Sequence, residues 1–161
     1  MPTDRSQQLA KRRASNGQGA VDNPRTHIMR SIRKKNTRPE INVRRILHAA
    51  GYRFRLHAAD LPGCPDIVLP KHRSVVLVHG CFWHQHPGCR YCKVPRTRPE
   101  YWLPKLARNV ERDSRSRALL KKQGWRVLTL WECETQKPDK MRDKILRFLS
   151  RVRSRNSFGG S

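Results

Sequence analysis

The chain has 161 residues and carries 36 lysine and arginine residues against 12 aspartate and glutamate residues, a formal charge of +24. This length suits one domain with its own core, and a mean hydropathy of −0.84 predicts that much of the chain is solvated. The composition excludes a membrane-spanning helix, because no apolar run reaches about 18–20 residues, and the N-terminus lacks the apolar segment of a secretory signal. The surplus positive charge predicts a polyanionic partner, and nucleic acid fits this better than an anionic membrane.

The two ends of the chain differ from its middle. Residues 1–25 are polar and basic without an apolar period, so we expect a flexible N-terminal arm. Residues 152–161 are expected to form a disordered tail. Residues 26–151 are predicted to form a single domain.

Two helices are predicted to begin at repeats of one tetrapeptide, Thr-Arg-Pro-Glu, which occurs at 37–40 and again at 97–100. Each copy matches a capping box, with threonine at the N-cap and glutamate three positions later, and proline is tolerated in a first turn. The helices should therefore start near residues 38 and 98. Gly51 and Gly124 are their expected stops, and Pro104 predicts a kink or a restart in the second.

The strands show different patterns. Residues 52–56 alternate between polar and apolar, which is typical of a half-buried strand, whereas 67–69 and 75–78 are short apolar runs typical of central strands. Residues 125–131 form a fourth candidate, and a final helix is expected over 139–151. The order helix, three strands, helix, strand, helix predicts an α/β sandwich in which helices flank a mixed sheet.

A metal site is predicted in the segment 79–92, which holds three histidines and three cysteines directly after a predicted strand. The five cysteines of the chain are odd in number and should be reduced, which argues against a disulfide framework. Zinc takes four sulfur or imidazole ligands in a tetrahedron. Cys81, His86 and Cys89 are close enough in sequence to share an ion with Cys133, although the pair Cys89 and Cys92 is also a plausible chelate.

Two alternatives bear on this cluster. Reduced cysteines with incidental histidines are the weaker interpretation of the segment 79–92. Cys64 stands apart from the other cysteines in sequence and is interpreted as structural.

A second candidate site combines an acid and a histidine at the ends of neighbouring strands. Asp66 opens one apolar run and His79 closes the next, so both should lie near one end of the sheet. A carboxylate there can hold Mg²⁺, which neutralises a phosphate and polarises water. Asp66 as a turn residue and Glu40 as the capping-box glutamate are open alternatives.

A third candidate lies on the second helix, where Asn109 and Asp113 are four residues apart and share a face. Leu106 and Val110 lie nearby, so this face is predicted to point toward the sheet. A buried carboxylate needs a partner, and a histidine from the segment 79–86 would suit, because a carboxylate orients imidazole and raises its basicity. An ordinary polar face in a highly charged helix is the alternative.

Aromatic pairs at 82–83 and 101–102 lie on or near loops beside basic residues. Such rings can stack on bases or wedge between them. We favour contact with nucleic acid for Phe82, Trp83 and Trp102, and core packing for Trp125 and Trp131, which lie on a predicted strand.

Taken together, the chain resembles the very-short-patch repair (Vsr) DNA mismatch endonucleases. The resemblance runs from about Met29 to Cys133 through separate motifs in one order: Met-Arg-Ser-Ile, Asn-Thr-Arg-Pro-Glu, Leu-Pro-Gly-x-Pro-Asp, His-Gly-Cys-Phe-Trp-His, Lys-Val-Pro, Tyr-Trp-Leu, Asn-Val-Glu-Arg-Asp and Trp-Glu-Cys. It implies a restriction-endonuclease-like three-layer α/β fold with a structural zinc site. It also implies Mg²⁺-dependent nicking of one strand 5′ to the thymine of a T:G mismatch that arises when 5-methylcytosine deaminates.

The resemblance also implies residue roles. Asp66 resembles the magnesium-binding aspartate, His84 the general base and Asp113 its orienting partner. The other implied site residues are His79 as a second active-site histidine, Glu40 as an auxiliary acid and Asn109 facing the site. The implied zinc ligands are Cys81, His86, Cys89 and Cys133. The implied DNA-contacting residues are Phe82, Trp83 and Trp102 as a wedge and Met29 from the other groove.

Three departures from the family pattern and several expectations about partners complete the prediction. The loop between His86 and Cys89 has one extra residue, and Cys92 stands where an apolar residue is expected. Val78 stands where a threonine can occur, so any metal contact at Val78 must come from its backbone carbonyl.

We expect a monomer on double-stranded DNA in the bacterial cytoplasm, in contact with mismatch-repair proteins.

Two rival functions stay open. One is a related nuclease that cuts another site or lesion, and the other is a zinc-containing nucleic-acid-binding protein without catalysis. The inward-facing acids argue against the second rival, since binding to phosphate gains nothing from added carboxylates.

Overall fold

The computed structural model describes residues 35–151, so the predicted arm at 1–25, the tail at 152–161 and Met29 lie outside the described residues. The elements in chain order are α2 (Arg38–Ala49), β1 (Arg55–Leu56), β2 (Ile67–Leu69), the 3₁₀ helix η1 (Pro70–His72), β3 (Ser74–His79), α3 (Pro99–Lys122), β4 (Arg126–Trp131), the 3₁₀ helix η2 (Glu132–Gln136) and α4 (Pro138–Ser150). Within this part of the chain, no helix is both long and apolar enough to cross a membrane.

The start of α2 agrees with the sequence prediction. Thr37 caps the helix, and the Thr37 hydroxyl donates to Glu40 Oε1 over 2.8 Å. The backbone N–H of Asn36 donates to Glu40 Oε2 over 3.1 Å, so the glutamate satisfies donors in front of the helix. Gly51 follows the helix with φ +80°, a conformation that favours glycine.

The start of α3 differs from the prediction. Arg98 adopts a left-handed conformation with φ 58°, the helix begins at Pro99, and no side chain caps it. In this copy of the tetrapeptide the proline is the first helical residue, so Thr97 stands one position too early to serve as the N-cap. The helix does not restart at Pro104, which is exposed near the N-terminal end, where water can satisfy the carbonyl that loses its partner.

A four-stranded mixed sheet in the order β1-β2-β3-β4 forms the middle layer. β1 and β2 pair antiparallel, β2 and β3 pair antiparallel, and β3 and β4 pair parallel, with α3 as the connection between the last two. β1 covers only Arg55–Leu56, both exposed, so the strand predicted over 52–56 is shorter and less buried than expected. Phe54 and Tyr52 instead pack their rings against the core from outside the ladder.

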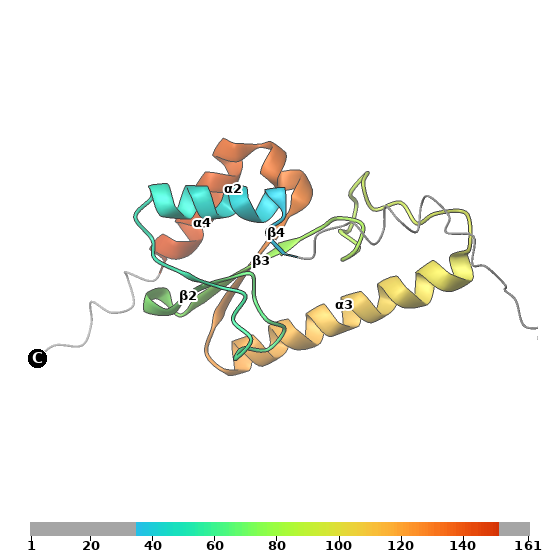
Figure 1. Ribbon diagram of the computed structural model, residues 1–161, viewed down its shortest axis with the longest axis horizontal. Coiled ribbons are helices and arrows are strands. Elements are labelled where there is room, and N and C mark those ends of the chain that lie inside the picture. The colour runs from blue at the N-terminus through green and yellow to red at the C-terminus, as the bar shows by residue number, and fades with distance from the viewer. Residues whose placement is uncertain (1–34, 152–161) are drawn as a thin grey trace, which may run out of the picture. The chain divides into compact units, whose positions relative to one another are not determined.

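Helices cover both faces of the sheet, with α2 and α4 on one side and α3 on the other (Figure 1). The first face buries one apolar cluster, which includes Leu47 of α2 and Ile145 of α4. The second face buries a smaller cluster around Leu120 of α3 and Val68 and Val75 of the sheet. This arrangement confirms the predicted three-layer α/β fold with a mixed central sheet.

The two apolar residues that predict an inward face on α3 differ in burial. Leu106 is buried, but Val110 is 40% exposed. Because α3 is long and only part of it lies against the sheet, its apolar residues are not all covered. The polar face with Asn109 and Asp113 nevertheless lies inward, where Asn109 contacts Trp83 and Asp113 contacts His84.

Candidate active site and metal centre

The parallel pairing of β3 and β4 brings the site residues together. His79 and Trp131 are direct partners at the last position of this ladder. Cys81 and Cys133 each lie two residues farther along the chain, so the same register delivers one thiol from each strand to the same end of the sheet. The turn after β3 then folds back on itself, with the N–H of His84 donating to the Gly80 carbonyl and that of His86 to the Cys81 carbonyl.

The predicted four-residue cluster is present. Cys81, His86, Cys89 and Cys133 offer ligand atoms that all lie within 4.8 Å of one another. The Nδ1 atom of His86 is 3.6 Å from Cys81 Sγ and 3.4 Å from Cys133 Sγ. Sulfur and nitrogen atoms bound to one tetrahedral zinc ion stand about 3.5 Å apart, given bond lengths of about 2.3 and 2.0 Å. The donor set therefore fits zinc in both chemistry and spacing.

The electrostatics of the cluster also favour a cation. Burial raises the pKa of the Cys81 thiol to about 12, and hydrogen bonding with the Cys133 and Cys89 thiols contributes to that shift. Burial likewise raises the pKa of Cys133. Three closely spaced thiols cannot all ionise unless a positive charge compensates them, and a bound metal deprotonates its thiol ligands.

The cysteines outside the cluster have other surroundings. All five cysteines are free, and Cys64 is exposed, so burial gives no support to its interpretation as a structural residue. Cys92 lies one turn beyond Cys89, with its N–H donating to the Cys89 carbonyl, and it is not among the four residues with converging ligand atoms.

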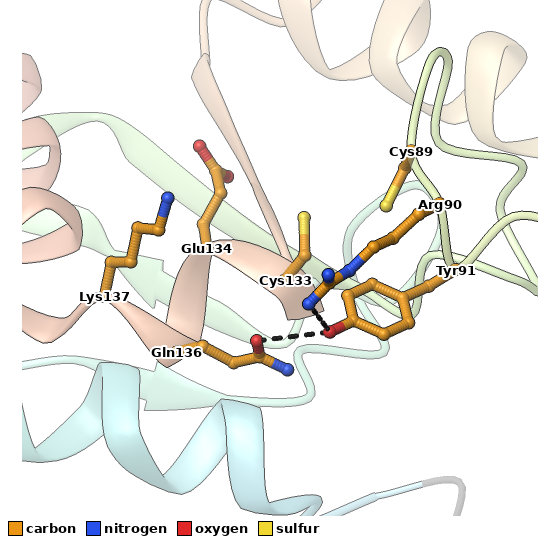
Figure 2. Close-up of a pocket in the computed structure, with 7 residues that line it drawn as sticks. All are labelled: Cys89, Arg90, Tyr91, Cys133, Glu134, Gln136 and Lys137. Atoms are coloured by element: carbon orange, nitrogen blue, oxygen red, sulfur yellow. Dashed lines mark hydrogen bonds between the residues drawn. The ribbon is translucent and has the colours of Figure 1, made fainter.

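A shallow hollow lies beside the cluster on the η2 side (Figure 2). Its lining residues are Cys89, Arg90, Tyr91, Cys133, Glu134, Gln136 and Lys137. The Tyr91 hydroxyl accepts from Arg90 over 2.7 Å and donates to Gln136 over 3.5 Å. These bonds link the cysteine-bearing loop to η2, which carries Cys133.

A histidine pair and an acid form the second group. His84 Nδ1 and Asp113 Oδ2 form a short hydrogen bond, as the predicted pairing between α3 and the 79–86 segment requires. Burial acts to raise the pKa of Asp113, but the hydrogen bond and charge of His84 outweigh it, so the pKa is lowered. The carboxylate therefore holds the Nδ1–H tautomer of His84, and the opposite ring nitrogen is left as a base.

His79 stacks on His84, with ring centroids 4.0 Å apart and an angle of 13° between the planes. Burial and the neighbouring His84 lower the pKa of His79 to about 4, so His79 is neutral at neutral pH. A neutral imidazole beside a second imidazole can donate or accept a hydrogen bond without adding charge.

The third group contains Asp66, Glu40 and His57, whose ligand atoms lie within 4.8 Å of one another. Asp66 Oδ2 accepts from the backbone N–H of Val78 over 2.7 Å, which joins the acid to β3. Burial raises the pKa of Asp66, and the nearby charge of Glu40 adds to this rise although the Val78 bond opposes it. A buried pair of carboxylates stabilises a divalent cation, whose charge removes their repulsion.

Glu40 caps α2 and also lies close to Asp66. Its side chain is 4% exposed, and its Oε2 atom lies 2.8 Å from Arg44 Nη2 and 3.7 Å from His57 Nε2. Arg44 Nη2 also stands 3.1 Å from His57 Nε2. One guanidinium nitrogen therefore contacts both the Glu40 carboxylate and the His57 imidazole. The structure confirms the capping role of Glu40 and places its carboxylate near Asp66, whereas the role of an auxiliary acid stays a prediction.

His57 and Arg44 were missed by the sequence reasoning. His57 directly follows β1 and has a positive φ of 46°, which is uncommon outside glycine. The spacing of Glu40 and Arg44 by four residues could have indicated an ion pair. No sequence pattern relates His57 to either residue.

The aromatic residues cluster at the exposed end of the site. Phe82, Trp83 and Trp102 contact one another at ring-centroid distances of 5.0–6.1 Å. Asn109 Nδ2 donates to the Trp83 carbonyl over 3.1 Å, so Asn109 fixes the aromatic loop rather than presenting a free amide. Lys105 Nζ lies 5.6 Å from the Trp83 ring centroid and supplies positive charge at the same place.

Comparisons with known proteins agree with this arrangement. A family model described as "DNA mismatch endonuclease Vsr" matches residues 21–90. The chain is 56% identical over 110 residues to the type II nicking enzyme V.XorIIP of Xanthomonas oryzae pv. oryzae, covering 68% of this chain and 80% of that protein. It is 44% identical over 122 residues to the DNA mismatch endonuclease Vsr of Escherichia coli, covering 76% and 78%.

The fold also has a counterpart among solved structures. The catalytic domain of the homing endonuclease I-Bth0305I superposes with a TM-score of 0.53 at 23% identity, covering 73% of this chain and 98% of that one. At this level of identity the likeness concerns the fold alone, which is that of an endonuclease.

Proposed function

Because this chain belongs to the family of Vsr DNA mismatch endonucleases and is a DNA endonuclease, we propose that it nicks one strand 5′ to the thymine of a T:G mismatch. Such mismatches arise when 5-methylcytosine deaminates. The observation that carries this proposal is the His84–Asp113 pair stacked against His79 at the end of β3, from which Asp66 also accepts a hydrogen bond. A protein that only bound DNA would gain nothing from inward-facing carboxylates in a basic surface.

The first requirement of the reaction is neutralisation of charge on the scissile phosphate. We infer that Asp66, with Glu40 and His57 beside it, holds a divalent cation, since these donor atoms lie within 4.8 Å of one another. Mg²⁺, when bound, supplies positive charge that stabilises the phosphate and the leaving oxygen. The protein's own contribution is to hold Asp66 in place through the backbone N–H of Val78.

The second requirement is a base for the attacking water. His84 is proposed as that base, because Asp113 occupies its Nδ1 side and leaves Nε2 free to take a proton. Asp113 orients the ring and stabilises the imidazolium that forms. His79, which is neutral and stacked against His84, is proposed to donate a hydrogen bond toward the phosphate without repelling the protonated base.

The third requirement is access to the strand at the mismatch. We propose that Phe82, Trp83 and Trp102 wedge into the duplex, with Lys105 near the backbone, because the three rings form one cluster beside the proposed base. Met29, outside the described residues, is proposed to enter from the opposite groove.

Zinc and the domain plan complete the proposal. Zinc held by Cys81, His86, Cys89 and Cys133 would fix the loop that carries His84 and the wedge. We propose that residues 26–151 form one endonuclease domain and that the protein acts as a monomer.

The proposal is tested by incubating the protein with T:G duplexes and Mg²⁺ and separating the labelled strands under denaturing conditions. Wild type should cut only the thymine-containing strand, and Asp66→Asn should bind the duplex but leave it uncut. Asp60→Asn is the matched control, because Asp60 is exposed in the same connection and forms an exposed ion pair with Arg55.

Two outcomes would contradict the proposal. Equal nicking by wild type and Asp66→Asn would exclude Asp66 from catalysis. Tight, salt-sensitive binding that Mg²⁺ never converts into a nick, across a panel of mismatches and paired duplexes, would instead favour a binding protein.

A further inference from the structure

Trp131 lies between the two groups of functional side chains. Its indole stacks on His86, with ring centroids 4.1 Å apart and planes within 6° of parallel. The same indole makes an edge-to-face contact with His79, with ring centroids 5.5 Å apart and planes at 78°, and His79 in turn stacks on His84 at 4.0 Å. The rings of a zinc-site histidine and of two active-site histidines therefore form one continuous series through Trp131.

This placement follows from the strand register. Trp131 is the direct partner of His79 in the parallel ladder, so their side chains emerge on the same face of the sheet at neighbouring positions. Cys133 follows two residues later and belongs to the four-residue cluster. One strand end thus supplies a metal-ligating thiol and the ring that contacts both sites.

Packing alone does not account for Trp131. The sequence predicts a core residue, yet within residues 35–151 Trp131 belongs to neither apolar cluster, and it is half-buried. Trp125, at the other end of the same strand segment, does pack against an apolar cluster. The indole of Trp131 instead contacts two imidazoles, those of His79 and His86.

We propose that Trp131 is a positioning residue that couples the metal centre to the catalytic histidines. A flat stack fixes the rotation of the His86 ring, and Nδ1 of that ring is the atom that points at the thiols. The same indole also contacts His79, on which His84 stacks. The indole of Trp131 therefore helps both to hold His86 in position for the metal and to align His84 as the base. The catalytic half of this inference rests on the proposed function, whereas the metal half does not.

The experiment compares Trp131→Leu, Trp131→Phe and the control Trp125→Leu in the zinc-loaded, full-length protein. The measurements are the rate of zinc release to a coloured chelator, the melting temperature, and kcat and KM for nicking of a T:G duplex. Groups that orient metal ligands typically change metal affinity or activity about 10–100-fold when removed. Trp131→Leu should therefore release zinc at least about 10-fold faster and lose kcat by a similar factor with KM little changed.

The variants separate positioning from simple packing. Trp131→Phe keeps a smaller ring and should fall between wild type and Trp131→Leu in both zinc release and kcat. Trp125→Leu should lower the melting temperature but leave zinc release and kcat near wild type. If Trp131→Leu matches Trp125→Leu in zinc release and kcat, the proposal is overturned.

Two further situations are also decisive. If Trp131→Leu does not fold, Trp131→Phe and Trp125→Phe are compared in the same assays, and equal zinc-release rates overturn the proposal. If wild type does not nick any mismatch, the proposed function fails. The zinc-release comparison still decides whether Trp131 orients the metal centre.

Discussion

Arg44 is expected to be essential for stability although it lies outside every motif in the sequence. Its guanidinium is 2.8 Å from the Glu40 carboxylate, and the two side chains are only 15% and 4% exposed. At an effective dielectric constant of about 20, Coulomb attraction at that distance is worth roughly 6 kcal/mol before the cost of desolvation. Removing one partner of a buried pair leaves the other charge uncompensated and costs about 3–5 kcal/mol.

Arg44→Met keeps most of the aliphatic stem and removes the charge. In magnesium-free buffer we expect a loss of about 3 kcal/mol in the free energy of unfolding, which corresponds to about 10 °C in melting temperature for a domain of this size. Mg²⁺ should then raise the melting temperature of Arg44→Met more than that of wild type, because a bound cation compensates the orphaned Glu40 charge.

Arg45→Met is the matched control, because Arg45 is the next residue on α2 and is exposed. Circular dichroism during heating, with and without Mg²⁺, measures both effects. Equal melting temperatures for the two variants in magnesium-free buffer would refute the reasoning, because they would mean that the Glu40–Arg44 pair contributes no more than an exposed charge.

Three other outcomes follow from the site. Cys81→Ser should lose zinc and melt at a lower temperature, whereas Cys92→Ser should keep its zinc content and its melting temperature. Metal analysis measures the zinc content and calorimetry the melting temperature. Zinc loss from Cys92→Ser would mean that Cys92 is a zinc ligand. Asp113→Asn should lower kcat about 10²–10⁴-fold by misorienting His84, while duplex binding measured by fluorescence anisotropy stays unchanged. Burial raises the pKa of Asp66, so at low pH a cation must displace a proton from its carboxyl group. The affinity for Mn²⁺, followed by electron paramagnetic resonance, should therefore rise with pH. An affinity that does not change with pH would contradict this.

The sequence predicted those features that depend on short spacing. The capping box at Thr37 and Glu40, the two central strands and the cluster of Cys81, His86 and Cys89 all reflect residues a few positions apart. Because a buried carboxylate on a helix face needs a partner, a histidine from the segment 79–86 was expected beside Asp113. The resemblance implied His84, and the structure brings these two side chains into contact.

Features that depend on backbone conformation or register were not predictable in the same way. Arg98 takes a left-handed conformation that displaces the start of α3, and nothing in the repeated tetrapeptide signals it. His57 reaches Glu40 because its own φ is positive. Trp131 was interpreted as a core residue because a strand pattern indicates that a side chain is covered. The pattern does not indicate which residues cover it.

The shared register of β3 and β4 has a consequence for how this protein can vary between relatives. An insertion inside β3 would rotate His79 to the opposite face and shift Cys81 with it, so both sites would be lost in one event. An insertion between His86 and Cys89 alters only a loop, where added length costs little entropy. Length changes should therefore accumulate in the loop that carries the metal ligands and be excluded from the strand that precedes it.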